Sequence, residues 1–283
     1  MAQSVITPQE MYEAERAVFA TGRASFELMQ EAGRGVADVL QSHYPEGSIS
    51  VLCGPGGNGG DGFIAAAHLA NLGREVSVFL SGSVDALKGD PKRAAAQWPG
   101  PIGSLSHALD ASADITLDAL FGGGLTRPLN GPAVQLAEAS RAPVISVDVP
   151  SGLDGATGRP LGSCFQAALT VTFAALRPAH VLSPGRRLSG QVEVIDIGVP
   201  VPAHTLYRDP TPSELERAQT FLSLEDVRDV LADPSVLALS AIECMRALAK
   251  QTGEAVYVTH PDRILARPDG MVVIAPSTTE PSI

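Results

Sequence analysis

The chain has 283 residues, of which 45% are hydrophobic and 18% charged, and it contains 28 glycines and 22 prolines. This composition is typical of a globular protein with many tight turns and excludes a disordered or low-complexity chain. Acidic residues outnumber basic ones 31 to 20, which gives a net charge of −11. A chain this acidic has no general attraction for nucleic acid or for an anionic membrane surface, so we expect neither as a partner.

The cysteines and the apolar segments indicate the cellular compartment in which the protein is expected. Cys53, Cys164 and Cys244 are widely spaced and give neither a disulfide framework nor a metal-binding spacing. The first residues carry no basic and apolar segments of a secretory signal, and the longest apolar stretch, around residues 167–176, is too short to span a bilayer. We therefore expect a cytoplasmic protein.

Residues 1–200 are expected to form one α/β domain. Two amphipathic helices come first, over residues 7–20 and 26–41. Short β-branched runs then alternate with glycine-rich turns and helices, which predicts a mostly parallel sheet with both faces covered. The expected strands are 48–53, 75–80, 115–121, 144–149, 168–173 and 191–197, and the expected helices between them are 63–71 and 132–140.

Residues 201–283 have a different composition. Prolines separated by charged residues predict a linker at the start of this stretch. Helices are expected over 223–231 and 236–249, and strands over 255–259, 263–266 and 271–274. The stretch is short for an independent α/β domain, so we expect a small α/β appendage.

The most distinctive motif is CGPGGNGGDGF, between an expected strand and an expected helix. Its residues Gly54, Gly56 and Gly59 match the G-x-G-x-x-G pattern of a dinucleotide-binding loop. The next expected strand ends without the acidic residue that would bind a ribose hydroxyl, and a backbone cradle for phosphate does not need Asn58 or Asp61. The alternative is a tight turn with Asp61 as a helix N-cap.

Two further loops carry glycine and aspartate. DALFGGGLTRP begins at Asp118 and ends near a lone Arg127, which alone is also explained by an Asp that caps a turn and a solvated arginine. SVDVPSGLDGATG places Asp148 in an apolar strand, where an unpaired carboxylate is costly, so we expect a partner or a polar cleft. Because the carboxyl ends of parallel strands share one edge, we expect the three loops to form one site.

The residue types of these loops indicate what the site binds. Asn58, Asp118 and Ser151 offer only oxygen ligands, which suit a hard cation and not zinc. The N–H groups of the glycines suit phosphates without the use of positive charge.

Four motifs in order, GPGGNGGDG, DALFGGGLTRPL, VDVPSGLDGATG and TVTFAALRP, resemble the YjeF N-terminal family of NAD(P)H-hydrate epimerases. The resemblance covers residues 3–200 and implies a three-layer Rossmann-like sandwich. It also implies a metabolite-repair isomerase that interconverts the R and S epimers of hydrated NADH and NADPH (NADHX and NADPHX). A separate NAD(P)H-hydrate dehydratase is then the expected functional partner, and a homodimer is possible.

The tail resembles separated pieces of the ribokinase-like dehydratase domain that is fused to many bacterial members. Much of that domain is missing, including its glycine-rich nucleotide segment, so we expect a truncated remnant over residues 201–283 without dehydratase activity. A chain that ends near residue 200 is then expected to remain folded and to keep any epimerase activity.

The resemblance also assigns residues. Asn58, Asp118 and Ser151 correspond to the ligands of a potassium ion, K⁺. Asp148 corresponds to the pocket aspartate that contacts the substrate, and it is our candidate for acid–base catalysis. The expected substrate-binding residues are Gly57, Asn58, Gly59, Gly60, Asp61, Gly122, Gly123, Gly124, Leu125, Thr126, Arg127, Pro128 and Asp148.

Three positions depart from the family's pattern. Gly57 stands in place of Asn and Gly123 in place of Thr, which removes two hydrogen-bonding side chains, and Arg177 stands in place of Lys. These departures leave open a non-catalytic binding or scaffold module. A nicotinamide-dependent oxidoreductase is disfavoured by the missing ribose-binding acid.

Overall fold

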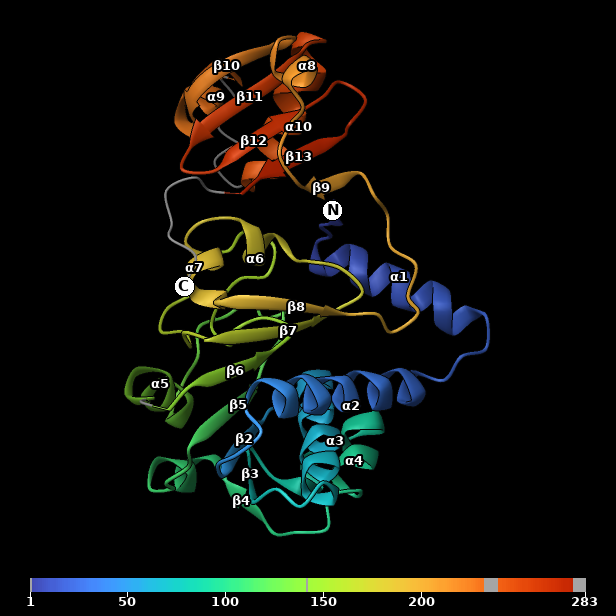
Figure 1. The fold of residues 1–283 in the computed structure, drawn as a ribbon, viewed down its shortest axis with the longest axis vertical. Coiled ribbons are helices and arrows are strands. Elements are labelled where there is room, and N and C mark those ends of the chain that lie inside the picture. The colour runs from blue at the N-terminus through green and yellow to red at the C-terminus, as the bar shows by residue number, and fades with distance from the viewer. Residues whose placement is uncertain (1, 141, 232–238, 277–283) are drawn as a thin grey trace.

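The computed structural model describes residues 2–140, 142–231 and 239–276. The chain forms two units stacked along the long axis of the molecule, with the N-terminus between them (Figure 1). The first unit holds a seven-stranded sheet in the order β4-β3-β2-β5-β6-β7-β8, and the second a six-stranded sheet in the order β1-β9-β13-β12-β11-β10. Among the helices that the structure describes, none is long and apolar enough to cross a membrane.

All neighbouring strands of the seven-stranded sheet are parallel, as the alternation of strands and helices predicts. The register sets Asp118 of β5 beside Ser146 of β6, one step inside the carboxyl edge. The strands are β2 (Ile49–Cys53), β3 (Val76–Leu80), β4 (Ile102–Ser104), β5 (Ile115–Ala119), β6 (Val144–Val147), β7 (Leu169–Phe173) and β8 (Gln191–Ile195).

Helices cover both faces of this sheet, which confirms the predicted three-layer α/β fold. One face carries α2 (Ser25–His43), α3 (Gly57–Asn71) and α4 (Gly89–Ala95). The other carries α5 (Pro132–Ala139) and the 3₁₀ helix η2 (Leu105–Leu109). Successive strand residues point to opposite faces: Val51 packs on the side of α2 and α3, whereas Leu52 packs with Phe165 on the other side.

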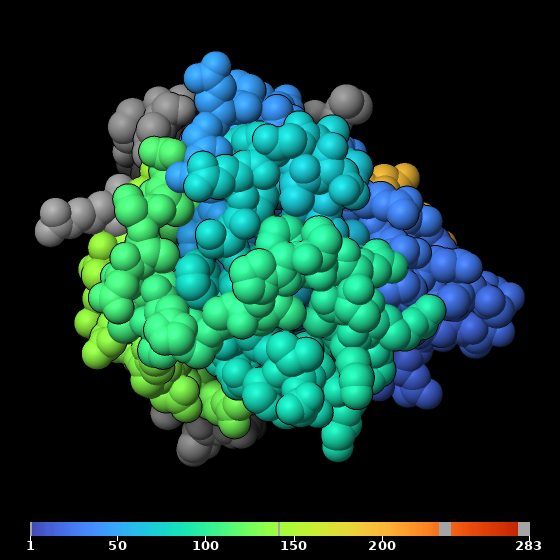
Figure 2. All heavy atoms as spheres, turned by 90° about the horizontal axis from the view of Figure 1, so that it is seen from below, coloured from blue at the N-terminus to red at the C-terminus, as the bar shows by residue number. Residues whose placement is uncertain are grey.

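The short elements of the first unit lie around this core. The helix α1 (Pro8–Ala20) runs beside the sheet, and α6 (Pro178–Val181) and α7 (Gly185–Ser189) lie between β8 and the second unit (Figure 1). A further 3₁₀ helix, η1 (Val84–Ala86), follows β3. Seen from below, the first unit hides nearly all of the second (Figure 2).

The second unit takes one strand from the other end of the chain. Its β1 (Gln3–Ser4) pairs antiparallel with β9 (Thr205–Tyr207), and β9 pairs parallel with β13 (Val272–Ala275). The remaining strands are β10 (Ala218–Ser223), β11 (Ala255–His260) and β12 (Arg263–Ala266), and the helices are α8 (Pro212–Leu215), α9 (Leu224–Leu231) and α10 (Ala241–Thr252).

Part of this unit was predicted differently. The stretch predicted as a linker contains β9 and α8, and β10 was not predicted. The helix predicted over residues 236–249 begins at Ala241 in the structure, and residues 236–238 lie outside the described residues.

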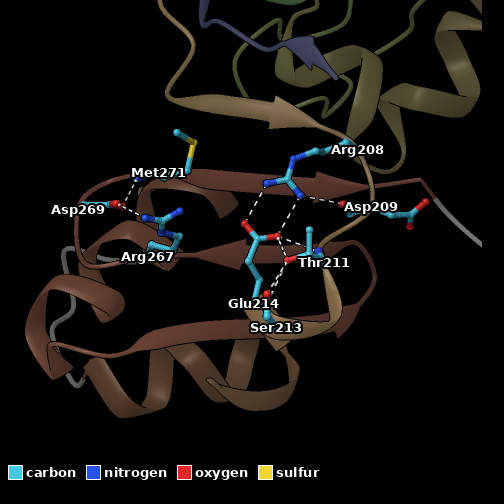
Figure 3. Close-up of polar contacts among 8 residues, drawn as sticks. All are labelled: Arg208, Asp209, Thr211, Ser213, Glu214, Arg267, Asp269 and Met271. Carbon is cyan, nitrogen blue, oxygen red and sulfur yellow. Dashed lines mark hydrogen bonds and ion pairs between the residues drawn. The ribbon is translucent and has the colours of Figure 1, made fainter. Parts of the chain in front are cut away.

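The helix α8 is one turn held by a polar network (Figure 3). Thr211 caps it: the Thr211 N–H donates to Glu214 Oε2 at 2.7 Å, and Thr211 Oγ1 accepts from the Glu214 N–H at 3.3 Å. The Arg208 guanidinium donates to both oxygens of Glu214, at 3.0 and 2.9 Å. These contacts, with that of Arg208 the strongest, lower the pKa of Glu214 to about 2. The presumed linker is therefore ordered by charge-assisted hydrogen bonds.

The two units share a hydrophobic core. Four residues of the first unit, Val5, Leu176, Val181 and Leu182, belong to the same buried cluster as the interior of the second. Polar contacts cross the same boundary, since the Ser183 N–H donates to the Asp262 carboxylate at 3.0 and 3.1 Å. The second unit contributes Val227, Ile242, Cys244, Met245, Leu248, Ala249, Val256, Val258, Ile264, Ala266, Val272 and Ile274 to the cluster.

Candidate functional site

The three predicted loops meet where β2, β5 and β6 end. With α1 and the end of β7 they line a cavity of about 290 Å³, the inner cavity. The loops after β2 and β5 also line a second cavity of about 480 Å³, the outer cavity. The two cavities adjoin, because both are lined by Gly57, Asn58, Gly122 and Gly124.

Most of the predicted binding residues line these cavities. Asp61, Gly123 and Asp148 line the inner cavity, whereas Leu125, Thr126 and Arg127 line the outer one. The exposed Arg127 is the cation of the outer cavity. Three predicted residues line neither cavity, namely Gly59, Gly60 and Pro128.

Glycine is required here because two loops approach each other closely. A Cβ atom on Gly54 would lie 1.8 Å from the carbonyl oxygen of Leu120, and one on Gly59 would lie 1.8 Å from that of Gly54. A Cβ atom on Gly57 would meet no atom within 4 Å. Gly54 therefore allows the β2 loop to pack on the β5 loop, and Gly59 allows the first turn of α3 to pack on the end of β2, whereas glycine is not required for space at position 57.

The helix α3 begins at Gly57, with Gly56 as its N-cap, and not at residue 63 as predicted. The alternative in which Asp61 is an N-cap is therefore wrong, because Asp61 lies one turn inside the helix. The early start places the first turn of α3, the positive end of the helix dipole, at the two cavities, which Gly57 and Asn58 line.

Asp148 was predicted within a strand over residues 144–149. In the structure β6 ends at Val147, so Asp148 directly follows it. Its φ of 63° is unusual for a residue other than glycine, and the Val149 N–H donates to the carbonyl oxygen of Val147 at 2.8 Å across the turn. Such a backbone conformation costs about 1–3 kcal/mol and is found most often at functional sites. The sharp turn places the Asp148 carboxylate at the wall of the inner cavity.

The expected partner of Asp148 is present. Its Oδ2 accepts from the Gly123 N–H at 2.8 Å, and its Oδ1 accepts from Thr172 Oγ1 at 3.0 Å. Oδ1 also forms an ion pair with Arg177 Nη2 at 3.2 Å, and the Arg177 side chain is only 3% exposed. Burial raises the pKa of Asp148, but Arg177 and these hydrogen bonds outweigh it, so the pKa lies below its usual value. Asp148 is therefore ionised at neutral pH.

His180 holds the backbone of the same residue. Its Nδ1 accepts from the Arg177 N–H at 2.9 Å, and its Nε2 lies 2.8 Å from the carbonyl oxygen of Asp148. Because Nδ1 accepts, the ring is neutral and Nε2 donates. Burial lowers the pKa of His180 to about 4. His180 thus positions Asp148 without facing the inner cavity.

Two further carboxyl groups line the inner cavity. Burial raises the pKa of Asp61 well above its usual value, and the charges of Asp148 and Glu15 raise it further. Burial also raises the pKa of Glu15, against the opposing effect of Arg177. Glu15 was not predicted as a site residue, although its position one turn after the buried Met11 on α1 indicates that it faces inward. Thr172 and His180 were missed as partners of Asp148 because no local pattern links them to it.

The predicted cation ligands are only partly brought together. Asp118 is fully buried, and its carboxylate accepts from Ser151 Oγ at 2.6 Å, from the Ser151 N–H at 2.8 Å and from Ser146 Oγ at 3.0 Å. Burial raises its pKa in spite of these hydrogen bonds. Asn58 lies against Gly122 on the neighbouring loop, since a Cβ atom on Gly122 would lie 3.1 Å from Asn58 Oδ1. Its buried Nδ2 has no hydrogen-bond partner among the described residues.

These features fit a monovalent cation. Asp118 is a buried carboxylate without an ion-pair partner among the described residues, and a bound cation would offset its charge. The unsatisfied atom of Asn58 is the Nδ2 donor, so the support for a cation comes from Asp118 and not from Asn58. The donors are oxygens throughout, as a hard cation requires.

Known proteins resemble this chain in sequence and fold. The family model "YjeF-related protein N-terminus" matches residues 25–179. A protein of Rhodopirellula baltica named NAD(P)H-hydrate epimerase is 40% identical over 184 residues, which cover 62% of this chain and 75% of that protein. A protein of Moorella thermoacetica named bifunctional NAD(P)H-hydrate repair enzyme Nnr is 37% identical, over 62% of this chain but only 37% of its own length.

The fold is also that of a solved structure. The crystal structure of the yeast protein ynu0 superposes with a TM-score of 0.59 at 24% identity, and the match covers 68% of this chain and 88% of the yeast chain. The family match spans the residues that bring together the loops of both cavities, from α2 to the segment that carries Arg177. The chain belongs to the family of YjeF-related protein N-termini.

Proposed function

We propose that this chain is an NAD(P)H-hydrate epimerase, which interconverts the R and S epimers of NADHX and NADPHX. The observation that carries the proposal is the ionised Asp148 carboxylate, fixed by Arg177, Gly123 and Thr172 at the wall of the inner cavity. In the hydrated cofactor the hydroxyl group is on the carbon next to the ring nitrogen. A positioned base that removes the hydroxyl proton allows the bond from this carbon to the ring nitrogen to break, and this step makes the carbon epimerisable.

The two cavities suit the two parts of a nicotinamide dinucleotide. The inner cavity, with its carboxyl groups, takes the hydrated ring. The outer cavity takes the phosphates, because it offers the N-terminal turn of α3 and the exposed guanidinium of Arg127. An acidic protein thereby binds an anionic substrate with local donors rather than with its net charge.

We also propose that Asp118, Ser151 and Asn58 hold K⁺. Bound there, the ion supplies a positive charge that offsets the buried carboxylate of Asp118. Asp118 in turn fixes Ser151, whose Oγ accepts from the Phe121 N–H at 2.9 Å, and so orders the loop that separates the two cavities.

A separate dehydratase completes the proposed repair. The relatives include proteins named bifunctional repair enzymes, and the match covers about a third of such a chain. We infer that this protein supplies epimerisation and works together with an NAD(P)H-hydrate dehydratase activity.

The test uses purified epimers. The full-length protein is mixed with the R epimer of NADPHX, and chromatography that resolves the epimers follows the appearance of the S epimer. The expected result is a rate above the uncatalysed rate and proportional to the protein concentration. Equal rates with and without protein would support a non-catalytic module instead.

A further inference from the structure

The inner cavity is lined by a second half-buried carboxyl group, that of Asp61, whose surroundings differ from those of Asp148. Resting on the epimerase function proposed above, we propose that Asp61 is a second catalytic residue. It gives a proton to the ring nitrogen of the hydrate while Asp148 takes the proton of the hydroxyl group.

The contacts of the two aspartates indicate which one acts as the acid and which one as the base. Asp148 is held by one guanidinium, one N–H group and one hydroxyl. Among the described residues, the Asp61 carboxyl has no hydrogen-bond donor and no cation beside it, although it lines the same cavity. A carboxyl group without a partner inside a cavity is available to the ligand.

The charges around Asp61 keep it protonated. The groups that face it are Glu15 from α1, Asp148 from the end of β6 and Arg177 beyond β7. The one cation among them is already paired with Asp148 at 3.2 Å. Burial and the two neighbouring carboxylates therefore hold the pKa of Asp61 high, whereas Arg177 holds that of Asp148 low. Two carboxyl groups whose pKa values are pushed apart form an acid and a base in one cavity.

The three carboxyl groups do not form a metal site instead. Within the described part of the chain, no three His, Cys, Asp or Glu side chains are grouped closely enough to hold a metal ion. Asp61 is also held rigidly, because it lies on α3, and a Cβ atom on Gly33 of α2 would lie 2.7 Å from its carbonyl oxygen. A proton donor on a close-packed helix stays in place while the substrate ring opens.

The proposed step balances without a further reactant. The bond between the hydrated carbon and the ring nitrogen breaks, and its electron pair goes to the nitrogen, which takes the proton of Asp61. The hydroxyl group loses its proton to Asp148 and becomes an aldehyde. Rotation about the carbon–carbon bond presents the other face of the aldehyde to the nitrogen. Ring closure then returns one proton from the nitrogen to Asp61 and one from Asp148 to the oxygen, which gives the other epimer.

The experiment compares Asp61→Asn with wild type and with Asp85→Asn, which removes an exposed carboxylate of η1 outside both cavities. Asp61→Asn is expected to lower kcat roughly 10²–10⁴-fold, the usual contribution of a general acid, with little change in KM. Asp85→Asn is expected to match wild type. Wild-type kcat should fall at high pH, when Asp61 loses its proton, and this limb should be absent from the residual activity of Asp61→Asn.

Two further measurements keep the proposal falsifiable. If Asp61→Asn does not fold, as judged by its melting temperature, Asp61→Ser and the wild-type pH profile replace it. Substrate labelled with oxygen-18 at the hydroxyl should keep its label during rapid epimerisation, because the ring-opened aldehyde retains that oxygen. Wild-type kcat in Asp61→Asn, or loss of the label at the rate of epimerisation, would overturn the role of Asp61 but not the epimerase function. A wild-type protein that does not epimerise the hydrate would overturn both.

Discussion

The carboxylate of Asp148 is held by three residues: Gly123 after β5, Thr172 within β7, and Arg177 between β7 and α6. Asp148→Asn retains the shape of the side chain but removes the base. We expect the variant to fold and to bind the hydrated cofactor, while the epimerisation rate above background falls roughly 10²–10⁴-fold. Chromatography of the two epimers measures the rate, and calorimetric titration measures binding. Epimerisation at the wild-type rate would leave Asp148 as a binding residue only.

The neutral ring of His180 makes the stability of the site depend on pH. Its pKa is about 4 in the folded protein and about 6.5 in the unfolded chain, so the unfolded chain binds the proton first as the pH falls. Stability should therefore be complete above pH 6.5 and decrease between pH 6.5 and 4. The loss is of the order of 3 kcal/mol, since one pKa unit corresponds to about 1.4 kcal/mol.

Denaturant unfolding at several pH values tests this expectation. His180→Gln retains one donor and one acceptor but does not titrate, so it should lose less stability than wild type between pH 6.5 and 4. Equal losses in the two proteins would assign the pH dependence to other groups.

Gly57 is a position at which the structure has room for a side chain. A Cβ atom there meets nothing within 4 Å, and both cavities adjoin this position. Gly57→Asn should therefore lower KM a few-fold, because one hydrogen bond contributes about 0.5–1.5 kcal/mol. The matched variant is Gly123→Thr, whose Cβ atom would lie 3.3 Å from both Asp148 Oδ2 and Pro8 Cγ. It should raise KM or lower kcat, because the crowded Cβ atom displaces Asp148. Steady-state kinetics of both variants measure these changes in KM and kcat.

At the scale of elements, the sequence predicts the strands and helices whose pattern is contained in a few neighbouring residues. The β-branched runs become β2, β3, β5, β6, β7 and β8, because apolar strands and their turns are encoded within a few residues. The start of α3 at Gly57 was missed, because five glycines among residues 56–62 predict a loop by propensity. Packing against the β5 loop overrides that propensity.

Contacts between distant elements were not predictable. The pair of β1 and β9 joins residues about two hundred positions apart, and each strand is too short to show a pattern. Likewise, Asp148 was expected to need a partner, but the sequence could not identify Arg177 as that partner, because the pair forms only when β6 and β7 lie side by side.

The proposed cation joins the ends of β5 and β6. We expect the melting temperature to rise with KCl but not with the same concentration of choline chloride. A ligand that binds only the folded protein at ten times its Kd adds about 1.4 kcal/mol. Asp118→Asn should abolish the difference between the two salts, even if it lowers the melting temperature in both. A difference that persists in Asp118→Asn would contradict the assignment of Asp118 as a ligand.

At the scale of the whole molecule, the C-terminal unit supports both walls of the inner cavity. The Val5 N–H donates to the carbonyl oxygen of Thr205 at 2.9 Å, and His204 Nε2 lies 2.6 Å from Glu10 Oε1 at the start of α1. Leu176, which belongs to the shared core, directly precedes Arg177. The tail therefore holds the elements that carry Glu15 and Arg177, although neither residue contacts it in the described structure.

The resemblance to a truncated domain implies that a chain ending near residue 200 remains folded and active. The contacts of the C-terminal unit favour the opposite expectation. Removal of residues 201–283 would expose Val5, Leu176, Val181 and Leu182, so the shortened chain should melt at a lower temperature and epimerise more slowly than the full chain. A point variant tests whether packing of the tail in the shared core stabilises the first unit. Met245→Ala creates a cavity in the shared core, at a cost of about 2–5 kcal/mol. If the two units unfold together, it should lower the temperature of one common transition in calorimetry. Two separate transitions, of which only one moves, together with full activity of the shortened chain, would show that the C-terminal unit is an independent appendage.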